Sequence, residues 1–147
     1  MQHRTIEEEL AVSGRALSYT VGVSMEPLLH NRRSTVVIER PRGALKPGDV
    51  ALYKNAQGDY VLHRVVGTAA GGYVIRGDNC FWKETVPPEK IIGVMAGYYA
   101  DEGEQYTPCG SPADLRYRRS LPLRFAKIWL RAFPGRAKRK LKRMLRK

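Results

Sequence analysis

The sequence predicts a mainly β protein with a short helix before the β domain and a basic, amphipathic helical tail after it. Three observations predict this architecture. β-like runs alternate with turn residues through the middle of the chain, a helix-start pattern lies near the N-terminus, and the charge changes abruptly near residue 115.

Six runs rich in β-branched and aromatic residues predict the strands. Glycine, proline, asparagine and aspartate separate them, as in Lys46-Pro47-Gly48-Asp49 and Gly77-Asp78-Asn79. The predicted strands are 17–23, 35–39, 50–53, 60–66, 73–76 and 91–99. Their regular spacing is typical of a small antiparallel β domain, either a sandwich or an open barrel.

A short helix is expected over residues 5–11. Thr5 can cap its N-terminus, and Glu8 has the spacing of a capping box. The helix should end at Gly14, because glycine readily adopts the left-handed conformation that ends helices.

The positive charge is concentrated at one end of the chain. The 147 residues carry a formal net charge of +12, yet residues 115–147 hold 14 Lys or Arg and no Asp or Glu. Residues 1–114 are left with 12 basic and 14 acidic side chains, so the body is near neutral. We therefore predict a β domain over 1–102, a Pro- and Gly-containing linker over 103–114, and a basic tail over 115–147.

The tail has the spacing of an amphipathic helix that Pro134-Gly135 interrupts. Its apolar stripe comprises Leu121, Phe125, Ile128, Trp129 and Ala132, and a second stripe comprises Leu141, Met144 and Leu145. Cations beside aromatic residues favour an anionic membrane surface as the partner. Nucleic acid is less favoured, because phosphate contacts do not require an apolar stripe. The third alternative is a helix that folds back on the β domain with its charged face in water.

The sequence predicts a cytoplasmic protein that its tail could hold peripherally at the inner membrane face. Its longest nearly apolar run, 91–100, has about half of the ~20 residues that a spanning helix needs. Glu7, Glu8 and Glu9 occupy the region where a secretory signal would be basic and then apolar. Cys80 and Cys109 are too few for a disulfide scaffold, and no Cys/His spacing predicts a metal or an organic cofactor.

Three segments of the body contain residue types suited to peptide-bond chemistry. Ser24 ends a β-like run just before Pro27, where a turn can expose its hydroxyl. A serine needs a base within hydrogen-bond reach, and His63 lies on a strand face with Val61 and Val65, whose apolar surroundings favour neutral imidazole. The turn after residue 76 supplies two carboxylates, Asp78 and Glu84, either of which could orient that imidazole.

Taken in order, four segments resemble the type I signal peptidase family, within the broader group that includes LexA-type self-cleaving repressors. Residues 22–29 (Gly-Val-Ser-Met-Glu-Pro-Leu-Leu) resemble its nucleophile box, and Gly48-Asp49-Val50 resembles the box that opens the next strand. Residues 60–67 (Tyr-Val-Leu-His-Arg-Val-Val-Gly) resemble the base-bearing strand, and Gly77-Asp78-Asn79 resembles the late box. The likeness runs from about residue 17 to residue 99 and implies the coiled antiparallel β domain of that family.

The resemblance implies a serine endopeptidase. Ser24 would be the nucleophile, its main-chain N–H an oxyanion donor, and His63 the general base in the manner of the endoplasmic-reticulum type. Asp78 is the preferred site-organising carboxylate. Glu84 is the alternative, because that branch has an acidic residue shortly after Gly-Asp-Asn. The expected substrate is a small peptide or protein precursor processed at the cytoplasmic side, with small residues such as alanine before the cut.

Departures from the family leave two other functions open. Family members carry a transmembrane anchor before the serine box, and no apolar span lies in the 23 residues before Ser24. Gly22 cannot supply a side-chain hydroxyl to the oxyanion hole, and Cys80-Phe81-Trp82-Lys83 replaces the usual polar stretch. The alternatives are an inert adaptor that binds anionic membrane or nucleic acid through its tail, and a LexA-like self-cleaving switch. The switch is disfavoured, because such proteins use lysine as base and no Ala-Gly or Cys-Gly bond precedes Ser24.

Overall fold

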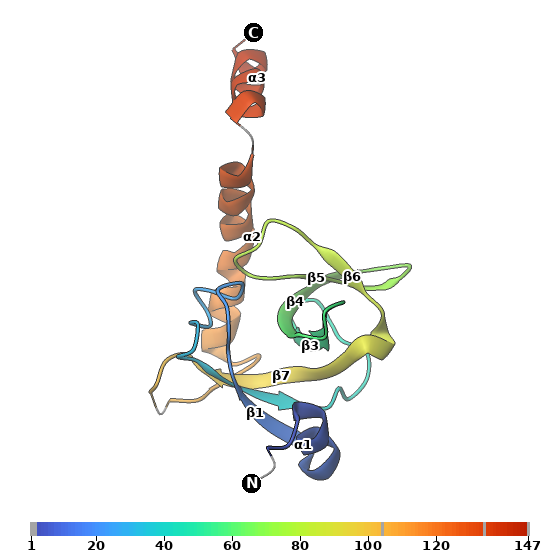
Figure 1. Ribbon diagram of the computed structural model, residues 1–147. Helices are drawn as coiled ribbons and strands as arrows, with labels where there is room; N and C mark the ends of the chain where they lie inside the picture. Colours follow the sequence, from blue (N-terminus) through green and yellow to red (C-terminus); the bar gives the residue numbers. More distant parts are fainter. Residues whose placement is uncertain (1–2, 104, 134, 147) are drawn as a thin grey trace.

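A computed structural model describes residues 3–103, 105–133 and 135–146 of the chain. It contains one eight-stranded antiparallel sheet, a short N-terminal helix and two C-terminal helices (Figure 1). The mainly β class, the N-terminal helix and the helical C-terminus predicted from the sequence are therefore confirmed.

The N-terminal helix α1 spans Ile6–Ser13 and has the predicted capping box. The main-chain N–H of Glu8 donates to the Thr5 hydroxyl, and its carboxylate accepts from the Thr5 N–H at 2.8 Å. Gly14 ends the helix with a φ of 75°, a conformation that costs a residue with a side chain more than it costs glycine. Leu10 is buried against the sheet, so α1 covers part of the core.

The sheet has the strand order β1-β2-β7-β3-β4-β5-β6, and β8 pairs with β7. Each pairing is antiparallel, and Figure 1 shows the sheet strongly coiled around β3 and β4. The strands are β1 (Arg15–Tyr19), β2 (Thr35–Glu39), β3 (Val50–Lys54), β4 (Tyr60–Ala69), β5 (Gly72–Arg76), β6 (Glu84–Val86), β7 (Ile91–Tyr99) and β8 (Thr107–Pro108), with a 3-10 turn η1 at Pro88–Lys90.

The interior consists of two apolar clusters on opposite faces of β3. Val50 and Leu52 contribute to one cluster, together with Leu10 of α1 and Ile38 of β2. Ala51 and Tyr53 contribute to the other. Because side chains alternate across a strand, a strand that is buried on both faces must be apolar at successive positions, as β3 is.

The structure differs from the predicted strands at three places. The strand expected over 17–23 is β1, which ends at Tyr19, because the main chain then turns: Gly22 has a φ of 94°. The N–H of Thr20 donates to the Ser34 carbonyl at 3.1 Å as the chain leaves the strand. Strands β6 and β8 were not predicted, because three and two residues are too short to give an alternating pattern.

Helix α2 spans Pro112–Ala132 and begins inside the segment that the sequence analysis interpreted as a linker. Ser111 caps it, and Asp114 is buried in its first turn, where its carboxylate accepts from the Gly110 N–H at 2.7 Å. β8 also lies within the expected linker. Helix α3 spans Gly135–Leu145, so the two helices are separate; the predicted break at Pro134 lies outside the described residues.

Leu121 of α2 is buried, and Phe125 packs under the Arg76 guanidinium at 3.9 Å. The side of α2 that carries Leu121 and Phe125 therefore packs on the folded body, in agreement with the fold-back alternative for that part of the expected tail. Among the helices of the described residues, none combines the length and hydropathy that crossing a bilayer requires.

We predict that Ile38→Ala lowers the free energy of unfolding by about 2–5 kcal/mol, because the fully buried side chain would leave a cavity in the first cluster. The measurement is urea denaturation followed by circular dichroism. Val12→Ala is the matched control, because Val12 is exposed on α1 and should change stability by about 0.5 kcal/mol or less. Equal effects of the two substitutions would contradict the assignment of Ile38 to the core.

Candidate active site

Ser24 lies in a hydrogen-bonded turn that follows β1. The Glu26 N–H donates to the Val23 carbonyl at 3.2 Å, and Met25 is buried beneath the turn, so Ser24 is held at the surface of the core. Asn79 secures the turn from across the molecule. Its main-chain N–H donates to the Ser24 carbonyl at 2.8 Å and its side-chain amide donates to the Val23 carbonyl at 3.0 Å.

His63 is held by β4, where it pairs in register with Ala51 of β3. Its side chain is 4% exposed, and Trp82 packs on it edge to face with ring centroids 5.6 Å apart. The strand pairing and the Trp82 ring together restrict the rotation of the imidazole.

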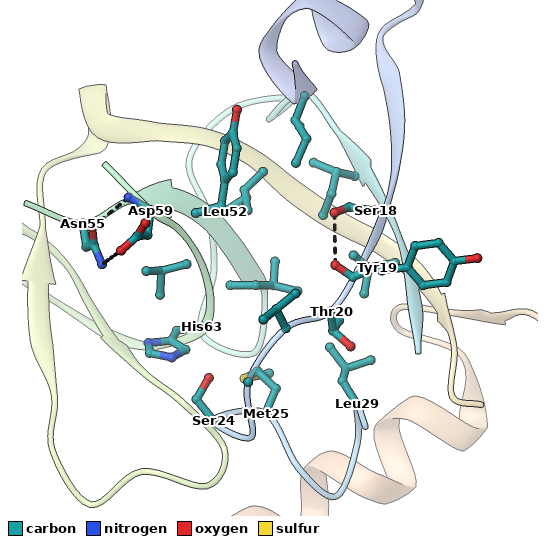
Figure 2. A pocket seen from close by; sticks show the side chains of 18 of the residues that line it. Ser18, Tyr19, Thr20, Ser24, Met25, Leu29, Leu52, Asn55, Asp59 and His63 are labelled. Carbon is teal, nitrogen blue, oxygen red and sulfur yellow. Dashed lines mark hydrogen bonds between the residues drawn. The ribbon is translucent and has the colours of Figure 1, made fainter. Parts of the chain in front are cut away.

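The imidazole lies between two different polar groups. A Cβ placed on Gly77 would lie 2.7 Å from the Ser24 carbonyl oxygen and 3.1 Å from Nε2 of His63, so Nε2 and the serine turn both border Gly77. Figure 2 shows the Ser24 and His63 side chains at one end of the same cavity. A side chain at position 77 would collide with the Ser24 carbonyl and with Sγ of Cys80 and would press on Nε2, so glycine at this position keeps the three groups close together.

Nδ1 of His63 faces the opposite way, toward Tyr53 and Glu84. The Tyr53 hydroxyl oxygen is 3.3 Å from Nδ1, and Oε1 of Glu84 is 4.0 Å from it. The same hydroxyl donates to Oε1 of Glu84. Because its only proton is committed to Glu84, the Tyr53 oxygen accepts from Nδ1–H, and this assigns the tautomer whose Nε2 is free to accept a proton from the serine side.

Burial keeps the imidazole neutral. Desolvation lowers the pKa of His63 below its ordinary value of 6.5, and the negative charges of Glu84 and Asp78 oppose that effect without overcoming it. Burial and the hydrogen bond to Glu84 raise the pKa of Tyr53, so Tyr53 remains a protonated donor throughout the range in which His63 titrates.

Asp78 forms a buried ion pair with Arg64, the residue that follows His63 on β4. The two side chains are 0% and 2% exposed, and two parallel hydrogen bonds of 2.8 Å join Nε and Nη2 of Arg64 to the two carboxylate oxygens. Nη1 of Arg64 donates to the Gly48 carbonyl at 2.7 Å, and the Asp78 N–H donates to Sδ of Met25 at 3.4 Å. The pair thus connects the four sequence boxes that carry the family resemblance.

Helix α2 holds the same loops from behind. The Tyr117 hydroxyl donates to Oδ2 of Asp78 at 3.0 Å. Arg124 donates to the Glu26 carbonyl and to Oδ1 of Asn79, each at 3.0 Å, and to the Asp78 carbonyl at 3.3 Å. The serine turn and the Gly77–Cys80 loop are therefore fixed to each other by one helix.

A cavity of about 640 Å³ extends from Ser24 and His63 along β1 (Figure 2). Apolar side chains form most of its lining, among them Met25, Leu29 and Leu52, and residues 18–22 form one side. β1 is the last strand at its end of the sheet order, so one of its edges is not paired with a strand of the described chain. The cavity can therefore accommodate an extended chain beside a strand edge.

The structure brings Ser24, His63 and Glu84 to one cavity, and it places Asp78 in the ion pair below it. The two candidate carboxylates thus have different surroundings: Glu84 is near Nδ1, whereas Asp78 organises the loops. The sequence analysis missed Tyr53, Asn79, Tyr117 and Arg124. A tyrosine or arginine far along the chain has no local signal that it will reach this site, although Asn79 lies within a recognised box.

No protein-family model, curated protein or solved structure matches this chain.

We predict that Asp78→Asn lowers the free energy of unfolding by about 3–5 kcal/mol, because it leaves the Arg64 guanidinium buried without its counter-ion. Urea denaturation measures the effect. Glu39→Gln is the matched control: it breaks the Arg15–Glu39 pair, in which the Arg15 side chain is 61% exposed, and should change stability by about 1 kcal/mol or less.

The double variant Arg64→Met/Asp78→Leu should be less destabilised than Asp78→Asn, because it leaves no buried unpaired charge. If Asp78→Asn were as stable as the wild type, the ion pair would not hold these loops together.

Proposed function

We propose that the protein is a serine endopeptidase in which Ser24 is the nucleophile and His63 the general base. In this proposal the sheet is a signal-peptidase-like catalytic domain, and the substrate is a peptide or protein precursor. The observation that carries the proposal is the arrangement around one buried imidazole: His63 and Ser24 line the same cavity, Nε2 and the serine turn both border Gly77, and Nδ1 faces Tyr53 and Glu84.

The proposed reaction is acyl transfer. Nε2 of His63 accepts the Ser24 hydroxyl proton as Oγ bonds to the scissile carbonyl carbon, and the Ser24 main-chain N–H donates to the developing oxyanion. The imidazolium then gives the proton to the leaving amine, and the C–N bond breaks. Nε2 then takes a proton from water as the water oxygen bonds to the ester carbonyl carbon, and the imidazolium gives that proton to Oγ of Ser24 as the acyl–oxygen bond breaks.

Glu84 and Tyr53 act as positioning residues in this proposal. The charge of Glu84 stabilises the imidazolium that forms during the reaction, and Tyr53 lies between the carboxylate and Nδ1. Asp78 acts one step further away, because its ion pair with Arg64 and its loop fix the serine turn.

The proposed substrate binds as an extended strand beside β1. Main-chain hydrogen bonds to this edge would orient the peptide, and the apolar cavity would take side chains next to the scissile bond. The family resemblance implies small side chains such as alanine before the cut.

We predict that Ser24→Ala and His63→Ala each reduce kcat/KM by at least about 1,000-fold, because each removes one half of the nucleophile-base pair. The measurement is mass mapping of a peptide library that is cut by the wild type. Urea denaturation serves as the control for folding. Cleavage at the wild-type rate by both variants would contradict the peptidase assignment and favour the adaptor function.

We predict that activity rises with pH through an apparent pKa below 6.5, since neutral His63 is the active form and burial lowers the pKa of His63. Activity is therefore lost as pH falls through that value. Glu84→Gln should move the midpoint to lower pH, because the negative charge of Glu84 raises the pKa of His63.

Profiles of kcat/KM against pH for the wild type and Glu84→Gln measure both effects. A wild-type profile that still climbs above about pH 9 would indicate a lysine-like base and contradict the assignment of His63.

A further inference from the structure

The C-terminal helices carry apolar side chains that the protein itself does not cover. The second half of α2 and all of α3 extend away from the sheet (Figure 1). Six large apolar residues are exposed there, and together they define what we call the outer apolar surface: Leu123, Trp129, Leu130, Leu141, Met144 and Leu145.

In α2 this surface differs from the stripe expected from the sequence. Leu121 and Phe125 of that stripe face the body, where Leu121 is buried and Phe125 lies under Arg76. Leu123, which is 64% exposed, and Leu130 lie seven residues apart and so share the opposite side of the helix. Trp129 adds an aromatic ring whose centroid lies 4.6 Å from that of Phe133, with the two ring planes tilted by 52°. The side of α2 that faces solvent is therefore apolar as well as cationic.

Helix α3 separates the two kinds of side chain more sharply. Leu141, Met144 and Leu145 lie at helical spacings of three and four residues and form one stripe, in which Leu145 is 79% exposed. Five cations cover most of the remaining circumference: Lys138, Arg139, Lys140, Lys142 and Arg143. This arrangement is typical of a helix that lies in the plane of a membrane surface.

Charge restricts what can occupy this surface. Residues 115–147 contain 14 Lys or Arg and no Asp or Glu, so a second copy of the chain would bring like charges together. A nucleic acid would neutralise the cations and leave the outer apolar surface in water. A bilayer with anionic headgroups can accommodate both the cations and the outer apolar surface, because the cations would lie at the phosphates while the apolar side chains enter the acyl region.

We propose that the second half of α2 and α3 form a docking surface for an anionic phospholipid membrane. The cations attract the protein to the bilayer, and the outer apolar surface provides the contact that added salt does not screen. This proposal goes beyond the peptidase function and is independent of it.

The test measures how the full chain floats with vesicles, either of phosphatidylcholine alone or containing about 25% phosphatidylglycerol. We expect at least about tenfold stronger partitioning onto the anionic vesicles. The variant Leu141→Ser/Met144→Ser/Leu145→Ser keeps every cation and should lose about tenfold of that partitioning. Val12→Ser, which removes an exposed apolar residue outside the docking surface, is the matched control and should bind as the wild type does.

A second readout reports the depth of Trp129. In a Trp82→Phe background Trp129 is the only tryptophan, and its emission should shift to the blue with anionic vesicles and not with duplex DNA. Ser24→Ala should partition like the wild type, so loss of catalysis and loss of docking are separable.

Three results would overturn the proposal: equal partitioning onto both kinds of vesicle, unchanged partitioning of the triple serine variant, or Trp129 emission that does not shift. If DNA displaces the protein from anionic vesicles and the triple variant binds DNA as the wild type does, the surface is a nucleic-acid site instead.

Discussion

Arg64 and Asp78 form an ion pair that is almost completely removed from solvent, and the loops of the candidate site are arranged around it. A buried guanidinium and a buried carboxylate are each costly alone, so the chain must keep them together with their remaining hydrogen bonds satisfied. Arg64 meets that requirement with the Gly48 carbonyl, and Asp78 meets it with the Tyr117 hydroxyl. This constraint brings the turn before β3, the strand β4, the loop after β5 and helix α2 to one point.

His63 gains its proposed role from its position beside that pair. Arg64 points to the ion pair, and His63, one residue earlier on β4, points to the other face of the strand, as alternation requires. The same strand thus carries an electrostatic anchor on one side and a desolvated imidazole on the other. Burial lowers the pKa of His63 and keeps it neutral, while Glu84 remains near enough to stabilise the charged form when a proton arrives.

Helix α2 joins the two functions that we propose. The side of α2 that faces the body holds the serine turn and the Asn79 loop through Arg124, and the side that faces solvent, from Leu123 onward, begins the outer apolar surface. A helix that is fixed to the body at one end and extends beyond it at the other would define where a membrane lies relative to the serine turn. Part of the basic charge is therefore used in packing, as in Arg124, and the rest is available for the docking that we propose.

Local sequence patterns were sufficient for much of the fold. The capping box and Gly14 predicted α1 within two residues at its C-terminal end, and five of the six expected strands lie within three residues of those observed. The sixth expected strand extended too far: β1 ends at Tyr19, because the chain turns over residues 20–23, where Gly22 has a positive φ. Ser111, Pro112 and Asp114 are helix-start signals, and the Pro- and Gly-rich composition around them concealed these signals in the sequence analysis.

The sequence by itself determined most of the secondary structure, the segregation of charge and the candidates Ser24, His63, Asp78 and Glu84, because these depend on neighbours along the chain and on ordered motifs. Only the tertiary structure decided that Glu84 lies near Nδ1, that Asp78 neutralises Arg64, and that Tyr53 and Arg124 belong to the site. It also decided which apolar residues of α2 are buried, because an amphipathic pattern marks a face and does not say whether protein or lipid covers it. The physical reason is the same in each case: burial and pairing are set by distances in space between residues that the sequence places far apart.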